Sequence, residues 1–178
     1  MKIEVKEKAN KEYYDELLYI ISNNVLKKNP HSKVKKITTH SMLLGLISLI
    51  ILIPFIILYI YDHYVMYLVV IILFTISIIL SIFYYILINK KLDEMVNTNK
   101  TSIFEINKDG VSIKVDKEEH KLKYKEIDNI IINKYSICFM SSTNQSLYTR
   151  IEYKEQVIEA LTKYKQDKLI IDNSKLYK

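Results

Sequence analysis

The stretch that decides the fold is Ser41–Tyr61, SMLLGLISLIILIPFIILYIY, followed after two residues by Tyr64–Asn89, YVMYLVVIILFTISIILSIFYYILIN. Neither run contains Lys, Arg, Asp or Glu, although 26% of the 178 residues are charged. A helix needs about 20 residues to cross the hydrocarbon core of a bilayer. We therefore interpret the two runs, 41–61 and 64–89, as transmembrane helices joined by a tight outer turn at residues 62–63, rather than as a buried helix pair of a soluble protein.

Lysines flank the two runs on the same side. Residues 1–40 carry nine Lys against five acidic residues, whereas the turn of Asp62 and His63 carries no Lys or Arg. Because short loops rich in Lys and Arg stay in the cytoplasm, we expect an integral protein of the inner (plasma) membrane with both termini cytoplasmic. The same lysines would also attract anionic membrane lipid. They are Lys27, Lys28, Lys33, Lys35, Lys36, Lys90 and Lys91.

Small residues recur at a spacing of four within both runs. Ser41 and Gly45 form one pair, and Ser77 and Ser81 form the other. Small residues at this spacing let helices approach closely, so we expect them to pack the hairpin on itself, with a homo-oligomer interface as the alternative. The absence of Lys, Arg, Asp and Glu from both runs argues against a transporter, a proton path or a voltage sensor.

The segment before the first run has two parts. Residues 2–6 alternate between polar and apolar side chains, as in a half-buried strand. Asn10 is a typical helix-capping residue ahead of a helix over Lys11–Leu26. The apolar stripe of that helix faces either the membrane interface or the C-terminal domain, and the mixed charges on its polar face favour the domain. We take residues 1–40 as the first cytoplasmic part.

Beyond the second run, a helical linker over residues 90–100 leads to a region with a period of two. Residues 101–165 predict five or six antiparallel strands in a meander, closed by an amphipathic helix over Glu152–Lys165. Gly110 is expected to supply a positive φ in a turn, and the tail, residues 166–178, to be loosely ordered. The predicted fold is an α+β membrane protein: a two-helix transmembrane hairpin with a small cytoplasmic antiparallel β-meander capped by a C-terminal helix.

The chain is poor in the patterns that catalysis and cofactor binding need. Its two glycines exclude phosphate-binding loops, and its four histidines lie at no metal-ligand spacing. Cys138 is expected to be a small buried position in a strand. One arginine and the lack of a recognition motif argue against nucleic-acid binding. From these absences together we expect no enzyme activity, no cofactor and no nucleic-acid partner. Arg150 either anchors a carboxylate or phosphate or forms a structural salt bridge with Glu152 or Glu155.

Four segments carry a family resemblance. They are Lys2–Tyr14 (KIEVKEKANKEYY), Phe104–Val111 (FEINKDGV), Leu122–Ile127 (LKYKEI) and Tyr148–Arg150 (YTR). Together they resemble the YcxB-like family of bacterial membrane proteins, although that family often has a proline where this chain has Tyr148 or Thr149. The resemblance implies a C-terminal domain similar to small pleckstrin-homology-like sheets. None of its motifs is catalytic.

Two functions are consistent with these observations. The first is a membrane-anchored interaction or scaffold protein that presents its small cytoplasmic domain to a protein or peptide partner at the inner leaflet, by strand addition or helix docking. The alternative is a bacterial immunity or envelope-defence protein that neutralises a membrane-active toxin through the transmembrane hairpin. An enzyme acting on lipid is disfavoured, because no convergent set of titratable residues can be assembled.

Overall fold

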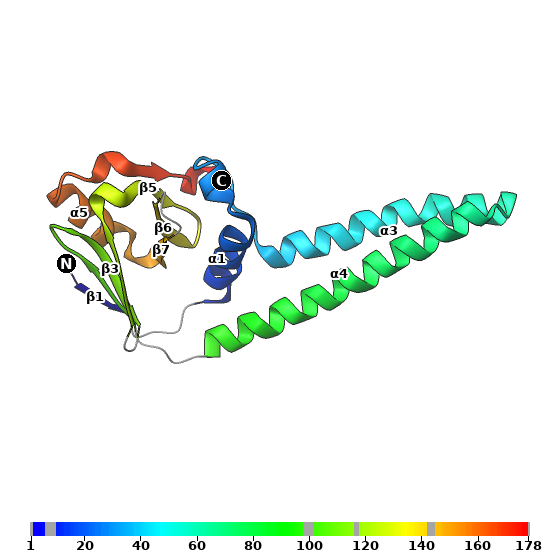
Figure 1. The fold of residues 1–178 in the computed structure, drawn as a ribbon, viewed down its shortest axis with the longest axis horizontal. Coiled ribbons are helices and arrows are strands. Elements are labelled where there is room, and N and C mark those ends of the chain that lie inside the picture. The colour runs from blue at the N-terminus through cyan, green and yellow to red at the C-terminus, as the bar shows by residue number, and fades with distance from the viewer. Residues whose placement is uncertain (1, 6–9, 98–101, 116–117, 142–144, 178) are drawn as a thin grey trace. The chain divides into compact units, whose positions relative to one another are not determined.

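The computed structural model describes residues 2–5, 10–97, 102–115, 118–141 and 145–177. They belong to two compact units. Lys35–Glu94 form the unit that we call the helix pair. The other, the sheet unit, combines the residues up to Val34 with those from Met95 onward (Figure 1). The sheet unit is therefore built from chain segments on both sides of the helix pair.

The helix pair consists of α3 (Ile37–Asp62) and most of α4 (Val65–Asn97). Both helices are long and apolar enough to cross a membrane. His63 ends α3 in the left-handed conformation, with φ 50°, and its backbone N–H donates to the carbonyl of Tyr59 at 2.9 Å. The first predicted run thus lies inside α3, and α4 continues beyond the end of the second run to Asn97.

The side chains of the helix pair are apolar and exposed. Among the residues that the structure describes, every exposed large hydrophobic side chain except Ile21 and Leu176 lies between Met42 and Leu87. A soluble monomer rarely exposes a contiguous apolar patch of more than a few hundred Å². A helix that is apolar all round belongs in a protein core or in lipid, and these two helices are not covered by a core.

The first sheet is antiparallel throughout and has the strand order β1-β2-β3-β4. Its strands are β1 (Lys2–Val5), β2 (Ser102–Ile106), β3 (Gly110–Val115) and β4 (Glu118–Lys123). Ile3 lies opposite Phe104 in the register of the first two strands. The strand that precedes the helix pair in the chain is therefore paired with the strand that follows it.

The second sheet has the strand order β7-β6-β5-β8. Strand β8 pairs parallel with β5, and the other pairs are antiparallel. Its strands are β5 (Ile127–Ile132), β6 (Ser136–Ser141), β7 (Leu147–Arg150) and β8 (Ile170–Asp172). Helix α5 (Lys154–Lys163) follows β7, and short 3₁₀ turns are η1 (Tyr124–Glu126), η2 (Ile151–Tyr153), η3 (Asp167–Leu169) and η4 (Ser174–Tyr177).

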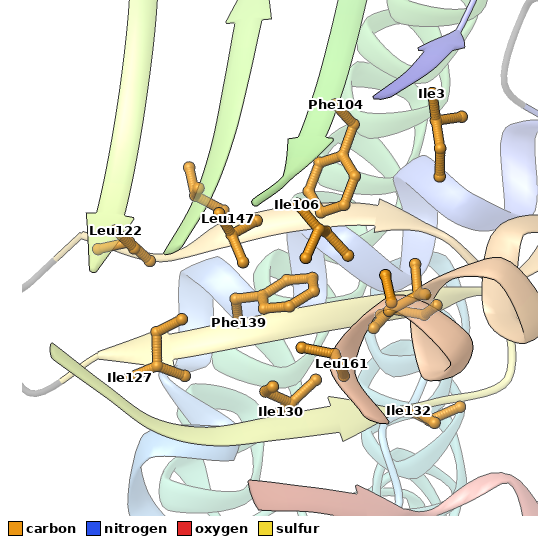
Figure 2. Close-up of a cluster of buried hydrophobic side chains, with 14 residues drawn as sticks. Ile3, Phe104, Ile106, Leu122, Ile127, Ile130, Ile132, Phe139, Leu147 and Leu161 are labelled. Atoms are coloured by element: carbon orange, nitrogen blue, oxygen red, sulfur yellow. The ribbon is translucent and has the colours of Figure 1, made fainter. Parts of the chain in front are cut away.

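The main core of the sheet unit lies between the two sheets. Phe104 of β2 and Phe139 of β6 are fully buried, and their ring centroids are 5.5 Å apart. Figure 2 shows side chains from both sheets converging on this centre, with Leu161 of α5 beside them. The other buried members are Ile3, Ile106, Val111, Leu122, Ile127, Ile130, Ile132, Ile137, Leu147, Val157 and Ala160.

A second core lies on the opposite face of the second sheet, beneath α1 (Lys11–Asn23) and α2 (Val25–Lys28). Its buried members are Ile20, Leu26, Val34, Ile131, Cys138 and Met140. The N-terminal helix therefore packs on the sheet, but through Ile20 and Tyr19 rather than through the predicted apolar stripe, in which Ile21 is 50% exposed. Strands β5 and β6 are consequently covered on both faces.

The α+β class is confirmed, but three expectations for the C-terminal part are wrong. The strands form two sheets rather than one meander, because β6 is buried at all six positions and has no solvent face. The tail contains β8, and Asn173 Nδ2 donates to the carbonyl of Pro30 at 2.7 Å. Gly110 has no positive φ. A Cβ there would lie 2.1 Å from the carbonyl oxygen of Leu122, so close strand approach requires the glycine.

Candidate functional site

A buried carboxylate links the N-terminal helix to the second sheet by hydrogen bonds. Glu16 of α1 is 2% exposed. Ser136 Oγ donates to its Oε1 at 2.6 Å, and the backbone N–H of Tyr135 donates to both carboxylate oxygens at 3.3 Å. Burial raises the pKa of Glu16 above its ordinary value of 4.5, although these hydrogen bonds oppose the shift. The contact joins residues that are 120 positions apart.

Cys138 and Asn133 extend this polar cluster inward. Asn133 is fully buried, and its Nδ2 lies 3.4 Å from Cys138 Sγ and 3.5 Å from Ser136 Oγ. Its Oδ1 has no hydrogen-bond partner among the described residues. Burial raises the pKa of Cys138 to about 12, so the group is a thiol at neutral pH. The prediction that Cys138 is a small buried position is confirmed.

A polar pocket opens near the C-terminal end of α1. Its volume is about 370 Å³. Asn24, which ends α1 with φ 50°, lines it together with Lys27 of α2. Ser146 and Tyr148 contribute hydroxyl groups from the opposite side of the pocket, at and just before β7, and the rest of the lining is Ile20, Ile21 and Met140. We call this the basic pocket, because Lys27 is its charged group.

The structure separates the seven flanking lysines that the sequence groups together. Lys27 lines the basic pocket, whereas its neighbour Lys28 is exposed and is not part of the lining. Lys33 places its Nζ 5.6 Å from the ring centroid of Tyr177. Lys35 and Lys36 form the link into α3, and two further exposed lysines, Lys90 and Lys91, lie in α4. Of the seven, Lys27 is the one that lines the basic pocket.

Arg150 lies at the end of β7 and is 7% exposed. Its Nη1 is 3.6 Å from Glu152 Oε2. Glu152 is one of the two acids that the sequence suggests as salt-bridge partners. The pair is one that the structural interpretation predicts, and the role of Arg150 as an anion anchor stays a prediction.

The outer edge of β4 is a second candidate surface. No strand among the described residues pairs with that edge, because β4 ends the order of the first sheet. Only Leu122 of its six residues is buried. An ion pair joins Lys121 Nζ to Glu119 Oε2 at 3.1 Å, and His120 Nε2 lies 3.9 Å from Glu118 Oε2. A shallow pocket of about 360 Å³ adjoins the strand, with both acidic and basic side chains in its lining.

Small residues bring α3 and α4 together. A Cβ added at Gly45 would lie 3.3 Å from Ser81 Cβ, and Ser48 Oγ is 3.1 Å from Ser77 Oγ. Ser41 is buried and donates instead within its own helix, to the carbonyl of Thr38. A groove of about 540 Å³ runs along the pair. The serine that sequence reasoning missed, Ser48, follows Gly45 by three positions and so lies on the same helix face.

Other site residues could not be read from sequence spacing. Glu16 and the walls of the basic pocket come from segments more than 100 positions apart, and no local motif links them. Among the described residues, no group of three His, Cys, Asp or Glu side chains is placed to hold a metal ion. No family model, curated protein or solved structure matches the chain.

Proposed function

We propose that the protein is a membrane-anchored recognition module. In this proposal the helix pair spans the inner (plasma) membrane with both termini in the cytoplasm. The sheet unit offers the outer edge of β4 to an extended segment of a protein partner at the inner leaflet. The observation that carries the proposal is the place of the helix pair in the chain. It follows α2 and precedes β2, so it interrupts the sequence of the sheet unit.

The insertion supports an anchoring role. The chain before the helix pair supplies β1 to the first sheet and two helices to the second, so the residues before and after the pair fold together. Only Lys35 and Lys36 separate Val34 of the sheet unit from Ile37 of α3, a span of at most about 11 Å. Folding as one unit favours placing both flanks on one membrane face, and their lysines favour the cytoplasm.

The edge of β4 supports recognition by strand addition. A terminal strand exposes backbone N–H and C=O groups that can pair with an extended peptide. Charged side chains such as its Glu and Lys protect an exposed strand edge from unspecific pairing with other chains. The adjoining pocket, whose lining includes Asp109, Ser112 and Lys121, can receive a side chain of the added strand. We propose that the sheet unit, with its two packed sheets and α5, is the pleckstrin-homology-like unit that the YcxB-like resemblance implies.

The test combines capture with an anchor exchange. A photo-crosslinking residue at Lys121 on β4 is expected to capture one specific protein, and the same residue at Lys163 on α5 is not. The capture should persist when residues 35–94 are replaced by an unrelated two-span hairpin. The captured segment, added as a peptide to the purified full chain, should slow hydrogen exchange of the β4 amides. Capture equally from both positions, or no protection of β4, would refute recognition through this edge.

The groove along the helix pair favours a second candidate, an immunity or envelope-defence protein that acts within the membrane. Its lining combines Leu and Ile side chains with Ser41, Ser77 and Ser81, a surface on which a toxin helix could pack closely. In that case the exchanged hairpin should abolish partner capture and protection against the toxin. Retention of both would exclude this candidate.

A further inference from the structure

We propose that the basic pocket binds the phosphate group of an anionic glycerophospholipid. The pocket is a defined cavity within the sheet unit, not a stretch of basic surface. Its volume of about 370 Å³ falls in the range of small-molecule sites. Its polar lining consists of one ammonium, one carboxamide and two hydroxyls, from Lys27, Asn24, Ser146 and Tyr148. No described lining residue carries a carboxylate.

This set of groups suits a phosphate. Lys27 supplies a positive charge, and lysine is a common point-charge partner of phosphate. Asn24, Ser146 and Tyr148 can each donate a hydrogen bond to a phosphate oxygen. Ser146 and Tyr148 line the same pocket from neighbouring positions in the chain. A phosphate has enough acceptor oxygens to engage several of these donors together.

The apolar part of the lining points to a lipid rather than to a soluble phosphate. Ile20 and Met140 are buried beside the polar groups, whereas Ile21 is 50% exposed. Ile21 and Leu176 are the two exposed large hydrophobic side chains among the described residues of the sheet unit. An exposed isoleucine beside a basic pocket fits the junction between a lipid headgroup and its acyl chains, where apolar and charged groups meet.

In the sequence, the α2 side of the basic pocket also lies close to the start of α3. After α2, Asn173 Nδ2 donates to the carbonyl of Pro30 at 2.7 Å, and Tyr177 Oη accepts from the Val34 N–H at 3.0 Å. These hydrogen bonds attach the segment that follows α2 to the C-terminal residues of the sheet unit. Only two residues then separate Val34 from the first residue of α3. A lipid headgroup is therefore a ligand that the proposed membrane position would bring within reach.

The test uses the full chain in detergent with phosphatidylglycerol or phosphatidylcholine, and native mass spectrometry counts the lipid retained. We expect preference for phosphatidylglycerol. Lys27→Gln should weaken its retention by about tenfold, the size of one lost charge-assisted contact. Lys28→Gln removes the same charge one position away, outside the pocket, and should leave retention nearly unchanged. Tyr148→Phe keeps the ring and should weaken retention by a smaller factor. Thermal unfolding in detergent alone checks that each variant is folded.

A second arm separates lipid from soluble phosphate. Inorganic phosphate is added against chloride at matched ionic strength, and the thermal midpoint is measured for the wild type, Lys27→Gln and Ile21→Ser. Loss of phosphatidylglycerol retention in both variants supports the lipid. Protection by inorganic phosphate that needs Lys27, with retention of phosphatidylglycerol unaffected by Ile21→Ser, overturns the lipid assignment in favour of a soluble phosphate. Equal weakening by Lys27→Gln and Lys28→Gln, or no effect of either, overturns the site.

Discussion

Runs of isoleucine occur in both units of the molecule, with opposite surroundings. Ile131 of β5 is fully buried, whereas Ile50 of α3 is 58% exposed. Ile130 and Ile132 of β5 lie in the main core on one face, and Ile131 lies in the core beneath the helices α1 and α2 on the other. The 26 residues of α3 have no such cover. The comparison teaches that apolar composition does not reveal the surroundings of a run, but that its length separates a short buried strand from a helix long enough to cross a membrane.

The largest expected effect comes from removing the cover of the second sheet. Deleting residues 1–34 takes away β1, α1 and α2, and exposes Ile131, Cys138 and Met140 to water. Because a domain of this size has little stability to spare, we expect the sheet unit to lose its cooperative fold. Near-UV circular dichroism and hydrogen exchange of the purified protein would detect the loss. Residues 1–34 added as a separate peptide should restore protection of β6. A truncated protein with native protection would show that the N-terminal segment is dispensable.

A matched pair of substitutions tests the comparison at single residues. Ile131→Ala leaves a cavity between two packed layers and should lower the free energy of unfolding by about 2–5 kcal/mol. Ile50→Ala removes the same atoms from an exposed position and should change stability by about 0.5 kcal/mol or less. Denaturant unfolding in detergent, followed by a signal from the sheet unit and one from the helix pair, measures both. Equal losses would mean that Ile50 is packed against protein.

Local patterns were enough to predict the helices. The charge-free runs and the cap at Asn10 depend on neighbours in the chain, and Asn10 Oδ1 does accept from the Tyr13 N–H at 2.8 Å. The period of two likewise located β2, where Phe104 and Ile106 are buried and Glu105 between them is not. Such features can be read from a window of a few residues, because their energetics are local.

The sheet arrangement and the sites depend on distant partners. Ile3 pairs with Phe104, and Glu16 meets Ser136, after the chain has passed through both long helices. Nothing near Glu16 in the sequence distinguishes it from a solvated acid on a helix. The doubly buried strand β6 has no alternation, so periodicity could not assign its faces. The basic pocket has the same origin, because Lys27 and Tyr148 face it from opposite ends of the chain.

Substitution of Glu16 should have a moderate effect on stability, and the size of that effect depends on pH. Burial favours its protonated form, so its contribution to folding is fully present below pH 4.5 and declines as pH rises through the raised folded pKa. Glu16→Gln should flatten this part of the pH profile. Glu16→Ala should cost about 1–3 kcal/mol, because Ser136 and the Tyr135 N–H lose their acceptor. Unfolding midpoints between pH 4 and 7 measure both. A wild-type profile that rises with pH over this range and matches that of Glu16→Gln would contradict the assignment.

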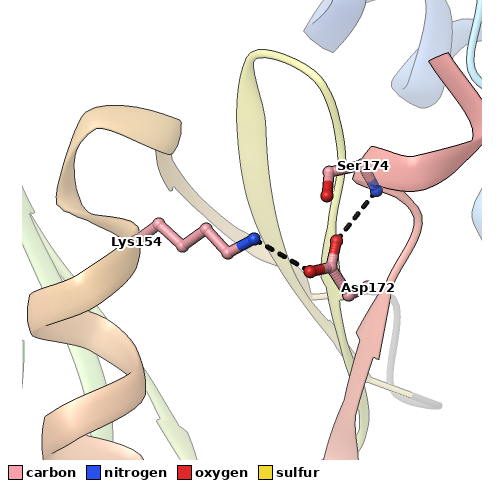
Figure 3. A network of polar contacts seen from close by, with 3 residues as sticks. All are labelled: Lys154, Asp172 and Ser174. Carbon is pink, nitrogen blue, oxygen red and sulfur yellow. Dashed lines mark hydrogen bonds and ion pairs between the residues drawn. The ribbon is translucent and has the colours of Figure 1, made fainter. Parts of the chain in front are cut away.

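The smallest effect is expected at an ion pair that joins α5 to the tail. Lys154 Nζ is 2.8 Å from Asp172 Oδ2, and the Ser174 N–H donates to Asp172 Oδ1 at 2.9 Å (Figure 3). Burial opposes ionisation of Asp172, but hydrogen bonds from Lys154 and Ser174 and the lysine charge together lower its pKa to about 2. Its contribution is therefore present above pH 3.8 and is lost as pH falls towards 2.

Lys154→Met tests this pair while keeping the length of the side chain. Both partners are about one-third exposed, so solvent screening limits the cost to about 0.2–1 kcal/mol at neutral pH. The carboxyl carbon resonance of Asp172 should then titrate at a higher pH than in the wild type. Lys163→Met, at an exposed position on the same helix, is the matched control and should leave that titration unchanged. An unshifted Asp172 in Lys154→Met would mean that the Ser174 hydrogen bonds alone hold its pKa down, and that the tail is attached to the sheet by β8 without help from α5.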